Sequence, residues 1–416
     1  MLTNLGNALG WCGRLVEAIA SYDAALALDP TFGMARGNRG ASLELYSRLT
    51  HETAHQSLLA REGYTELVRA LKGRKLWPDA RASFVRARER IERHFSREYL
   101  NAVPHDHNER LGRSKRERDY RQWCLRERLV LNPLNELGAR PVAARDTLTL
   151  PGMIEPIGRG PKYHGFFNQL KQEYATARYL AYEGEHADRP HFSDRYVELT
   201  DMYDYAAYGI GVEKARIAYR MAYSILDKVA VFVNEYFEAG WKPRRAEFRW
   251  LWYEKRDADA PLRKAVYRRD NPGLQALFWL SKDLYDEDTP YAEATEPEAA
   301  EAAEIRNHLE HRYVKLHTEF AGPPRWPIYA VDSAGAEPLD RAGDPFAAFG
   351  RDNLALSISR RDFARRTLWV LRTARAALLY MVFAVRIQEH AREAAHPHPE
   401  RVLTNFLQAV SDEWKV

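Results

Sequence analysis

The stretch VEKARIAYRMAYSILDKVAVFVNEYFEA, residues 212–239, has the apolar pattern of one long α-helix. Apolar side chains recur three or four positions apart along it, at Ile217, Met221, Ile225, Val229, Phe232 and Tyr236. Gly209 and Gly211 stand just before this run and are expected to break the chain there. An amphipathic helix of this length needs other helices to cover its apolar face.

Three further long helices are expected around this stretch. The first ends near Gly184 and carries Phe166, Phe167, Leu170 and Tyr174 on one face. The next begins at Pro297, a residue typical of a first helical position, and ends before the breakers at 322–324. The last runs from about 353 to 394. Four long helices with long inserts predict an all-α bundle, with one short strand pair at EFRWLWYE, residues 247–254.

The N-terminal region has a different pattern. Small and large apolar residues resemble a tetratricopeptide repeat with its period of 34 residues, at Leu2, Leu5, Gly6, Leu9, Ala18, Tyr22, Ala25 and Pro30. We therefore predict a repeat-like region of helical hairpins at 1–130 and a Pro/Gly-rich linker at 131–161. The bundle would then occupy 162–416. Repeats of this kind dock partners, so a protein partner is expected there.

Composition excludes several classes of protein. The chain has 416 residues, of which 45% are hydrophobic, so it can bury a sizeable core and is not disordered. Its two cysteines are too few for a disulfide framework or a zinc ligand set. The longest apolar run, 376–385, is far shorter than a membrane span, and the first residues lack the pattern of a signal peptide. We expect a cytoplasmic protein with no membrane partner.

The stretch EIRNHLEHRYVKLH, residues 304–317, concentrates the candidate site on the third long helix. On an extended helix, Arg306, Glu310 and Tyr313 would share one stripe, while Asn307 and His311 would share the neighbouring one. Asn307 could then orient the imidazole of His311. A histidine that moves a proton, beside an arginine that stabilises developing charge, is what RNA cleavage by its own 2′-hydroxyl needs. That reaction requires no metal.

The segment Arg306 to His311, followed by Tyr313, resembles the signature of the HEPN superfamily of helical ribonucleases. That signature is Arg, a polar residue and then His after a short spacing. The resemblance implies a four- to five-helix bundle that forms a homodimer with two facing copies of the motif. It also implies that Arg306 and His311 are catalytic and Asn307 supports them. Modification or RNA contact is expected at Tyr313, Arg312 and Lys315.

Three alternatives remain open at this point. The same stretch could be an exposed helix face whose charges merely pair with one another. A HEPN bundle could also bind RNA, nucleotide or a protein without cutting. HETAH, residues 51–55, matches the two-histidine pattern of zinc proteases, although no third ligand is apparent. No dinucleotide or phosphate-binding loop is present, so no cofactor and no metal are expected.

The resemblance thus implies a metal-independent endoribonuclease of a bacterial toxin or phage-defence type. It would cut RNA through a 2′,3′-cyclic phosphate, with the N-terminal repeats as a sensor or docking module. The alternative is a non-catalytic scaffold.

Overall fold

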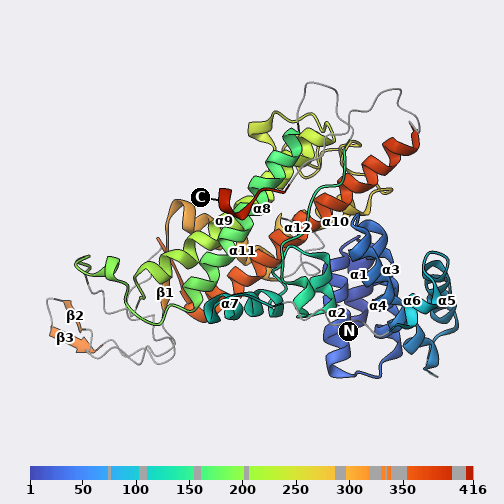
Figure 1. Cartoon of the computed structure of the whole chain (residues 1–416). Helices are drawn as coiled ribbons and strands as arrows, with labels where there is room; N and C mark the ends of the chain where they lie inside the picture. The colour runs from blue at the N-terminus through green and yellow to red at the C-terminus, as the bar shows by residue number, and fades with distance from the viewer. Residues whose placement is uncertain are drawn as a thin grey trace.

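The computed structural model describes residues 1–73, 76–102, 110–153, 161–200, 206–285, 297–317, 329–332, 335–338, 354–395 and 409–415. The chain is mostly helical, as predicted (Figure 1). The N-terminal helices are α1 (Leu2–Trp11), α2 (Leu15–Leu28), α3 (Gly33–Leu49), α4 (Thr53–Lys72), α5 (Pro78–Glu92), α6 (Arg97–Asn101) and α7 (Lys115–Arg126). The remaining α-helices are α8 (Lys162–Glu185), α9 (Ile210–Tyr236), α10 (Pro272–Tyr285), α11 (Pro297–His311) and α12 (Arg360–Ala395).

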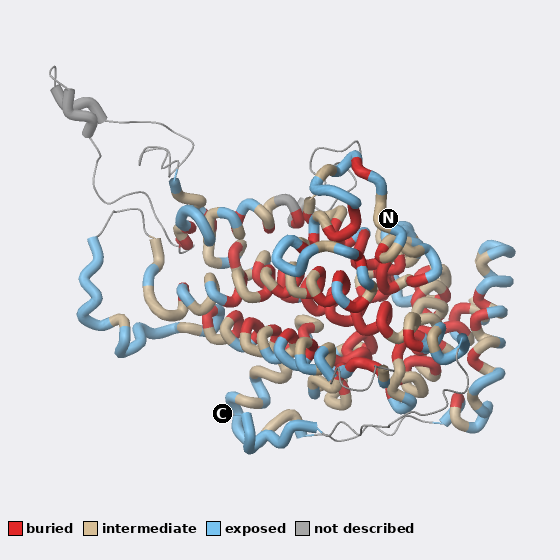
Figure 2. Tube along the Cα trace, turned by 90° about the horizontal axis from the view of Figure 1, so that it is seen from above, coloured by how far each residue is buried: buried red, intermediate tan, exposed pale blue. Residues whose placement is uncertain are grey.

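Helix α12 is the central element of the bundle. It packs against α8, α9, α10 and α11, and its residues 374–385 are all buried (Figure 2). This helix is long and apolar enough to cross a membrane, but 83% of its most apolar window is buried inside the protein. Its apolar surface is therefore accounted for by the core.

Close helix contacts depend on glycine. A Cβ atom on Gly273 of α10 would lie 2.4 Å from the backbone nitrogen of Ala384 and 2.5 Å from the carbonyl oxygen of Tyr380, both in α12. Any larger residue would push these two helices apart. Helix α9 begins after Gly209, whose φ of +119° favours glycine, and the amide of Ile210 donates to the Asp194 carboxylate at 3.0 Å.

The N-terminal helices form hairpins that share the core of the bundle. Helix α1 packs against α2, and α3 against α4. Tyr380 of α12 accepts a hydrogen bond from the backbone amide of Val16 at 3.1 Å, and the rings of Tyr46 and Phe383 meet edge to face at 5.2 Å. The tetratricopeptide assignment of these hairpins stays a prediction.

Much of the predicted linker is buried. Leu131, Leu134, Ala143 and Leu148 are all almost completely shielded from solvent, and the 3₁₀ turn η1 (Pro133–Leu137) lies against α4 and α2. The boundaries 1–130, 131–161 and 162–416 stay a prediction, since the hydrophobic core is continuous from Leu15 to α12.

Three local expectations were wrong: the third long helix does not continue toward 322, the last does not begin near 353, and residues 247–254 do not form a strand pair. Helix α11 ends at His311 and is followed by strand β1 (Tyr313–His317), which pairs in parallel with β4 (Ala355–Ser359) just before α12. A second pair, β2 (Tyr329–Asp332) with β3 (Gly335–Pro338), is antiparallel. Val314 and Leu316 are buried on one side of β1, so this alternating segment gains more as a strand than as a continued helix. The breakers at 322–324 lie outside the described residues.

The third error concerns residues 247–254, which do not pair as strands. They lie in turns, with a single bridge between Tyr253 and Leu262. Trp252 is fully buried, with its ring 5.6 Å from that of Phe278 in α10, and its indole nitrogen donates to the carbonyl of Phe248 at 3.0 Å. These aromatic side chains fill the core beside α10. The sequence pattern had not predicted α10 as a separate helix.

Candidate functional site

Helix α11 carries Arg306, Asn307 and His311, for which the sequence predicted a catalytic role. Ala299, Ala302 and Ile305 are buried and form the face of α11 that packs on the bundle. The other side of the helix therefore projects away from the core, and Asn307 and His311 are exposed on it.

Arg306 lies at the edge of the packed face. Its guanidinium carbon is 5.8 Å from the centre of the Tyr223 ring in α9, and a terminal nitrogen is 3.4 Å from the side-chain oxygen of Asn307. The first contact is a cation–π interaction, and the second is too long to be a strong hydrogen bond. Arg306 is therefore held on the α9 side of α11.

Beneath Arg306 lies a polar cluster that sequence reasoning missed. The hydroxyls of Tyr223 and Tyr285 are 3.1 Å apart, and the Asp227 carboxylate accepts a hydrogen bond from the amide of Phe248 at 3.1 Å. Burial raises the pKa of Asp227, although the Phe248 amide and the charge of Arg306 act in the opposite direction. The sequence signal that could have revealed this cluster was a single carboxylate, Asp227, inside the buried stretch of α9.

His311 and Asn307 line a cavity of about 550 Å³ at the end of α11. The other described residues that line it are Glu301, Ala303, Glu304, His308 and Arg312. The Nδ1 atom of His308 is 3.0 Å from the carbonyl oxygen of Glu304, so this second imidazole is tied to its own helix. The structure thus brings Asn307, His311 and Arg312 together.

Arg306 is not among the described residues that line this cavity. Arg306 and His311 are five positions apart, which on an α-helix places them about 140° apart around the axis. Within one chain, therefore, the arginine faces α9 while the histidine faces the cavity.

Tyr313 and Lys315 lie on β1 rather than on the helix. The predicted stripe of Arg306, Glu310 and Tyr313 is consequently wrong, because the helix ends two residues before Tyr313. The Tyr313 ring is 45% exposed, and the Lys315 ammonium lies 5.6 Å from its centre. Both side chains remain close in sequence to His311 and can meet a ligand that leaves the cavity along β1.

The two-histidine pattern at 51–55 does not form one helical face. His51 precedes α4, which begins at Thr53, and its Nε2 atom is 3.0 Å from the Thr149 hydroxyl. The Nδ1 atom of His55 lies 3.1 Å from the Glu52 carboxylate. Across the part of the chain that the structure describes, no group of three or more His, Cys, Asp or Glu side chains is arranged to hold a metal ion.

A long-helix bundle with an arginine, a polar residue and a histidine at the end of one helix defines the class of HEPN domains. The family model LA2681-like HEPN matches residues 154–388, more than half of the chain, and the protein belongs to this family. Searches of curated proteins and of solved structures found no match. HEPN domains are often ribonucleases, so membership supports a ribonuclease-related role at the level of the family.

Proposed function

We propose that this protein is a metal-independent endoribonuclease of a bacterial toxin or phage-defence type. The observation that carries the proposal is the cavity at the end of α11, where exposed His311 lies beside Asn307 and Arg312 in a HEPN bundle. An accessible imidazole is needed because a general base must reach the proton that it removes.

In the proposed reaction, His311 accepts the proton of an RNA 2′-hydroxyl. The 2′-oxygen attacks the adjacent phosphorus, the bond to the 5′-oxygen breaks, and that oxygen leaves with a proton returned to it. The products are a 2′,3′-cyclic phosphate and a free 5′-hydroxyl. Asn307 orients the imidazole, while Arg312 and Lys315 contact phosphates of the bound strand.

Arg306 requires a second copy of the chain. Because it faces α9 rather than the cavity of its own His311, we propose that its guanidinium stabilises charge at a site completed by a second chain. We therefore propose a homodimer in which two α11 ends face each other. The repeat-like N-terminal helices would dock a protein partner or sense a trigger, in the cytoplasm.

The test is cleavage of a mixed RNA substrate, with a chelator present, by the protein and its His311→Ala variant. We expect 2′,3′-cyclic phosphate ends with the protein and at least a hundredfold slower cleavage with the variant, the size of a lost general base. The matched control is His308→Ala, which removes an imidazole from the same cavity and should keep most of the activity. Equal cleavage by His311→Ala and the unaltered protein would refute the proposal.

The second candidate is the non-catalytic scaffold, and the orientation of Arg306 favours it. If the arginine serves only to pack α11 on Tyr223, the bundle can bind RNA without cutting it. In that case Arg306→Ala would lower stability and leave RNA binding unchanged, and no protein variant would produce cyclic phosphate ends.

A further inference from the structure

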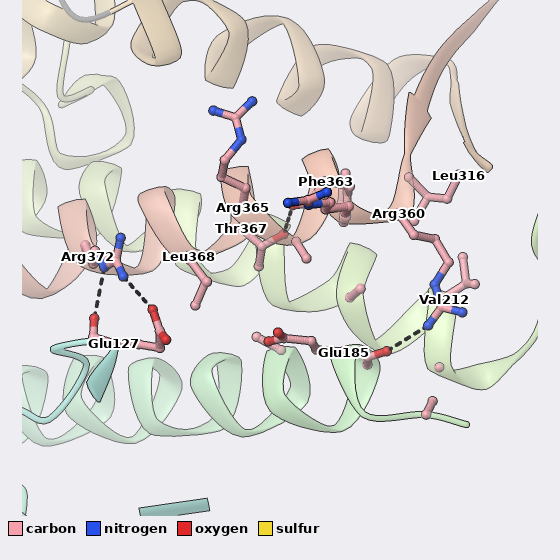
Figure 3. Close-up of a pocket in the computed structure, with 17 residues that line it drawn as sticks. Glu127, Glu185, Val212, Leu316, Arg360, Phe363, Arg365, Thr367, Leu368 and Arg372 are labelled. Carbon is pink, nitrogen blue, oxygen red and sulfur yellow. Dashed lines mark hydrogen bonds and ion pairs between the residues drawn. The ribbon is translucent and has the colours of Figure 1, made fainter. Parts of the chain in front are cut away.

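A second cavity lies between the N-terminal part of α12 and the facing ends of α8 and α9. Its volume is about 640 Å³, within the range of ligand sites. Figure 3 shows Arg360 and Arg372 near its two ends. These two residues are twelve positions apart on α12, so the cavity extends about 18 Å along the helix. We call it the α12 groove.

Four arginines line the α12 groove, against two carboxylates. The arginines are Arg360, Arg361, Arg365 and Arg372, and the carboxylates are Glu127 and Glu185. Arg372 is neutralised, because it donates to the Glu127 carboxylate at 2.6 Å and to the Glu127 carbonyl at 2.9 Å. Arg360 instead donates to the uncharged carbonyl oxygen of Gly184 at 3.3 Å, so the positive charge at its end of the groove is retained.

The rest of the groove is lined by small or apolar groups. Gly184 and Gly211 are in close contact, since a Cβ on Gly184 would lie 2.8 Å from the carbonyl oxygen of Gly211. Ala181, Ala187, Ala215 and Leu368 also contribute to the lining. A surface of this kind admits a flat base, while the arginines can reach phosphates.

The backbone amide of Asp362, in the first turn of α12, is capped and does not supply the positive charge. The amide of Asp362 donates to the Ser359 hydroxyl at 2.9 Å, and that hydroxyl donates in turn to the Asp362 carboxylate at 2.9 Å. Arg365 also donates to the Asp362 carboxylate at 3.3 Å, so its charge is balanced there, whereas Arg360 keeps its positive charge beside the groove.

We infer that the α12 groove binds the single-stranded RNA substrate at a distance from the cleaved bond. This inference rests on the proposed function. Leu316 of β1 lines the groove, and Arg312 lines the cavity at the end of α11, so a strand segment of about 13 Å connects the two. At a rise of about 3.4 Å per stacked nucleotide, the groove itself could hold about five nucleotides.

The first test measures binding of a 20-nucleotide RNA that carries 2′-O-methyl groups and cannot be cut. Arg360→Ala/Arg361→Ala removes two phosphate contacts, so the slope of the logarithm of the binding constant against the logarithm of the salt concentration should become shallower by about 1.4. At 0.1 M salt, this variant should therefore bind roughly 25-fold more weakly than the unaltered protein does. The difference should shrink toward 1 M salt.

The matched control is Arg244→Ala/Arg245→Ala. This pair is exposed in the turn η4 (Pro243–Arg245), beyond the other end of α9, about 40 Å from the groove by helix length. It removes the same charge and should change affinity by less than twofold. An equal loss in both double variants, or no loss in the groove variant, would overturn the inference.

A second variant distinguishes a lost RNA contact from a groove variant that binds weakly only because it is unfolded. Glu127→Gln removes the carboxylate that holds Arg372, and it should tighten RNA binding about fivefold, because one more cation becomes available for a phosphate. A damaged protein cannot gain affinity in this way, so unchanged or weaker binding by a folded Glu127→Gln variant would count against the groove.

Cleavage rates with short and long RNA distinguish a failure of this inference from a failure of the proposed function. A dinucleotide is too short to reach the groove, so Arg360→Ala/Arg361→Ala should cut it at the normal rate while KM for long RNA rises. Normal cleavage of both substrates would refute the groove and leave the ribonuclease intact. If His311→Ala and the unaltered protein are both inactive but bind RNA through the groove, the catalytic proposal fails and the groove stands.

Discussion

Helix α12 carries two kinds of arginine, represented by Arg360 and Arg375. Arg375 is 1% exposed, and its guanidinium donates to the Glu136 carboxylate at 2.6 Å and to the carbonyl oxygens of Val130 and Asn132. Arg360 is half-buried and faces a groove, and among the described residues it donates one long hydrogen bond. The two residues lie about 22 Å apart along the same helix.

The difference shows how burial and satisfied donors separate structural from ligand-binding arginines. A guanidinium that is fully bonded inside the core has no donor left for a ligand, and it stabilises only the protein's own segments. Arg375 thus fixes residues 130–136 on α12, whereas Arg360 of the α12 groove keeps donors that can turn toward a phosphate.

The largest expected effect on stability comes from breaking the buried ion pair between Arg375 and Glu136. Arg375→Ala leaves the buried Glu136 carboxylate without its close partner and with only the longer 3.7 Å pair to Arg128, so the free energy of unfolding should fall by about 3–5 kcal/mol. Urea denaturation of the two proteins measures this. The double variant Arg375→Met/Glu136→Leu, which removes both charges, should recover most of the loss. A single-variant cost below about 1 kcal/mol would show that Arg375 does not hold the segment.

The next effect depends on pH and concerns a second structural arginine. Arg178 donates to both carboxylate oxygens of Asp146, at 2.8 and 2.7 Å. Burial alone would raise the pKa of Asp146, but Arg178 outweighs it and holds the pKa below the usual 3.8. The stabilisation is therefore complete above pH 3.8 and is lost as the pH falls through the lower folded value.

The variant Asp146→Asn should accordingly cost about 1–3 kcal/mol of unfolding free energy at pH 7 and less at pH 3. Denaturation of both proteins at the two pH values tests this. Asp270→Asn is the control, because its pair with Arg268 lies at the surface and should be worth less than about 0.5 kcal/mol. A cost for Asp146→Asn that is the same at both pH values would contradict the assigned pKa.

Periodicity within the sequence predicted α8, α9, α11 and α12 of the bundle, but not α10. The apolar stripe of α9 and the proline at the start of α11 were both interpreted correctly, since they depend on residues only a few positions apart. The HEPN family was predicted from the short motif between Arg306 and His311, and the family model confirms that prediction. The catalytic roles assigned to that motif stay predictions.

Features that depend on distant residues could not be predicted in this way. Arg375 and Glu136 are 239 positions apart, and the α12 groove combines side chains from α8, α9, β1 and α12. Strand β1 was missed because its partner, β4, lies beyond a long insert. Nor could the sequence show that Arg306 packs on Tyr223, because helical spacing gives the angle between two residues but not the neighbours of either.

The smallest expected effect is the change in stability caused by Arg360→Ala. Its one hydrogen bond, to the Gly184 carbonyl, is long and partly open to solvent, so its loss should lower the unfolding free energy by less than about 1 kcal/mol. Thermal denaturation beside Arg375→Ala measures the contrast. If Arg360→Ala costs as much as Arg375→Ala, the distinction between the two arginines fails, because Arg360 would then be a structural residue. A small cost combined with weaker RNA binding would instead place the function of Arg360 in the groove.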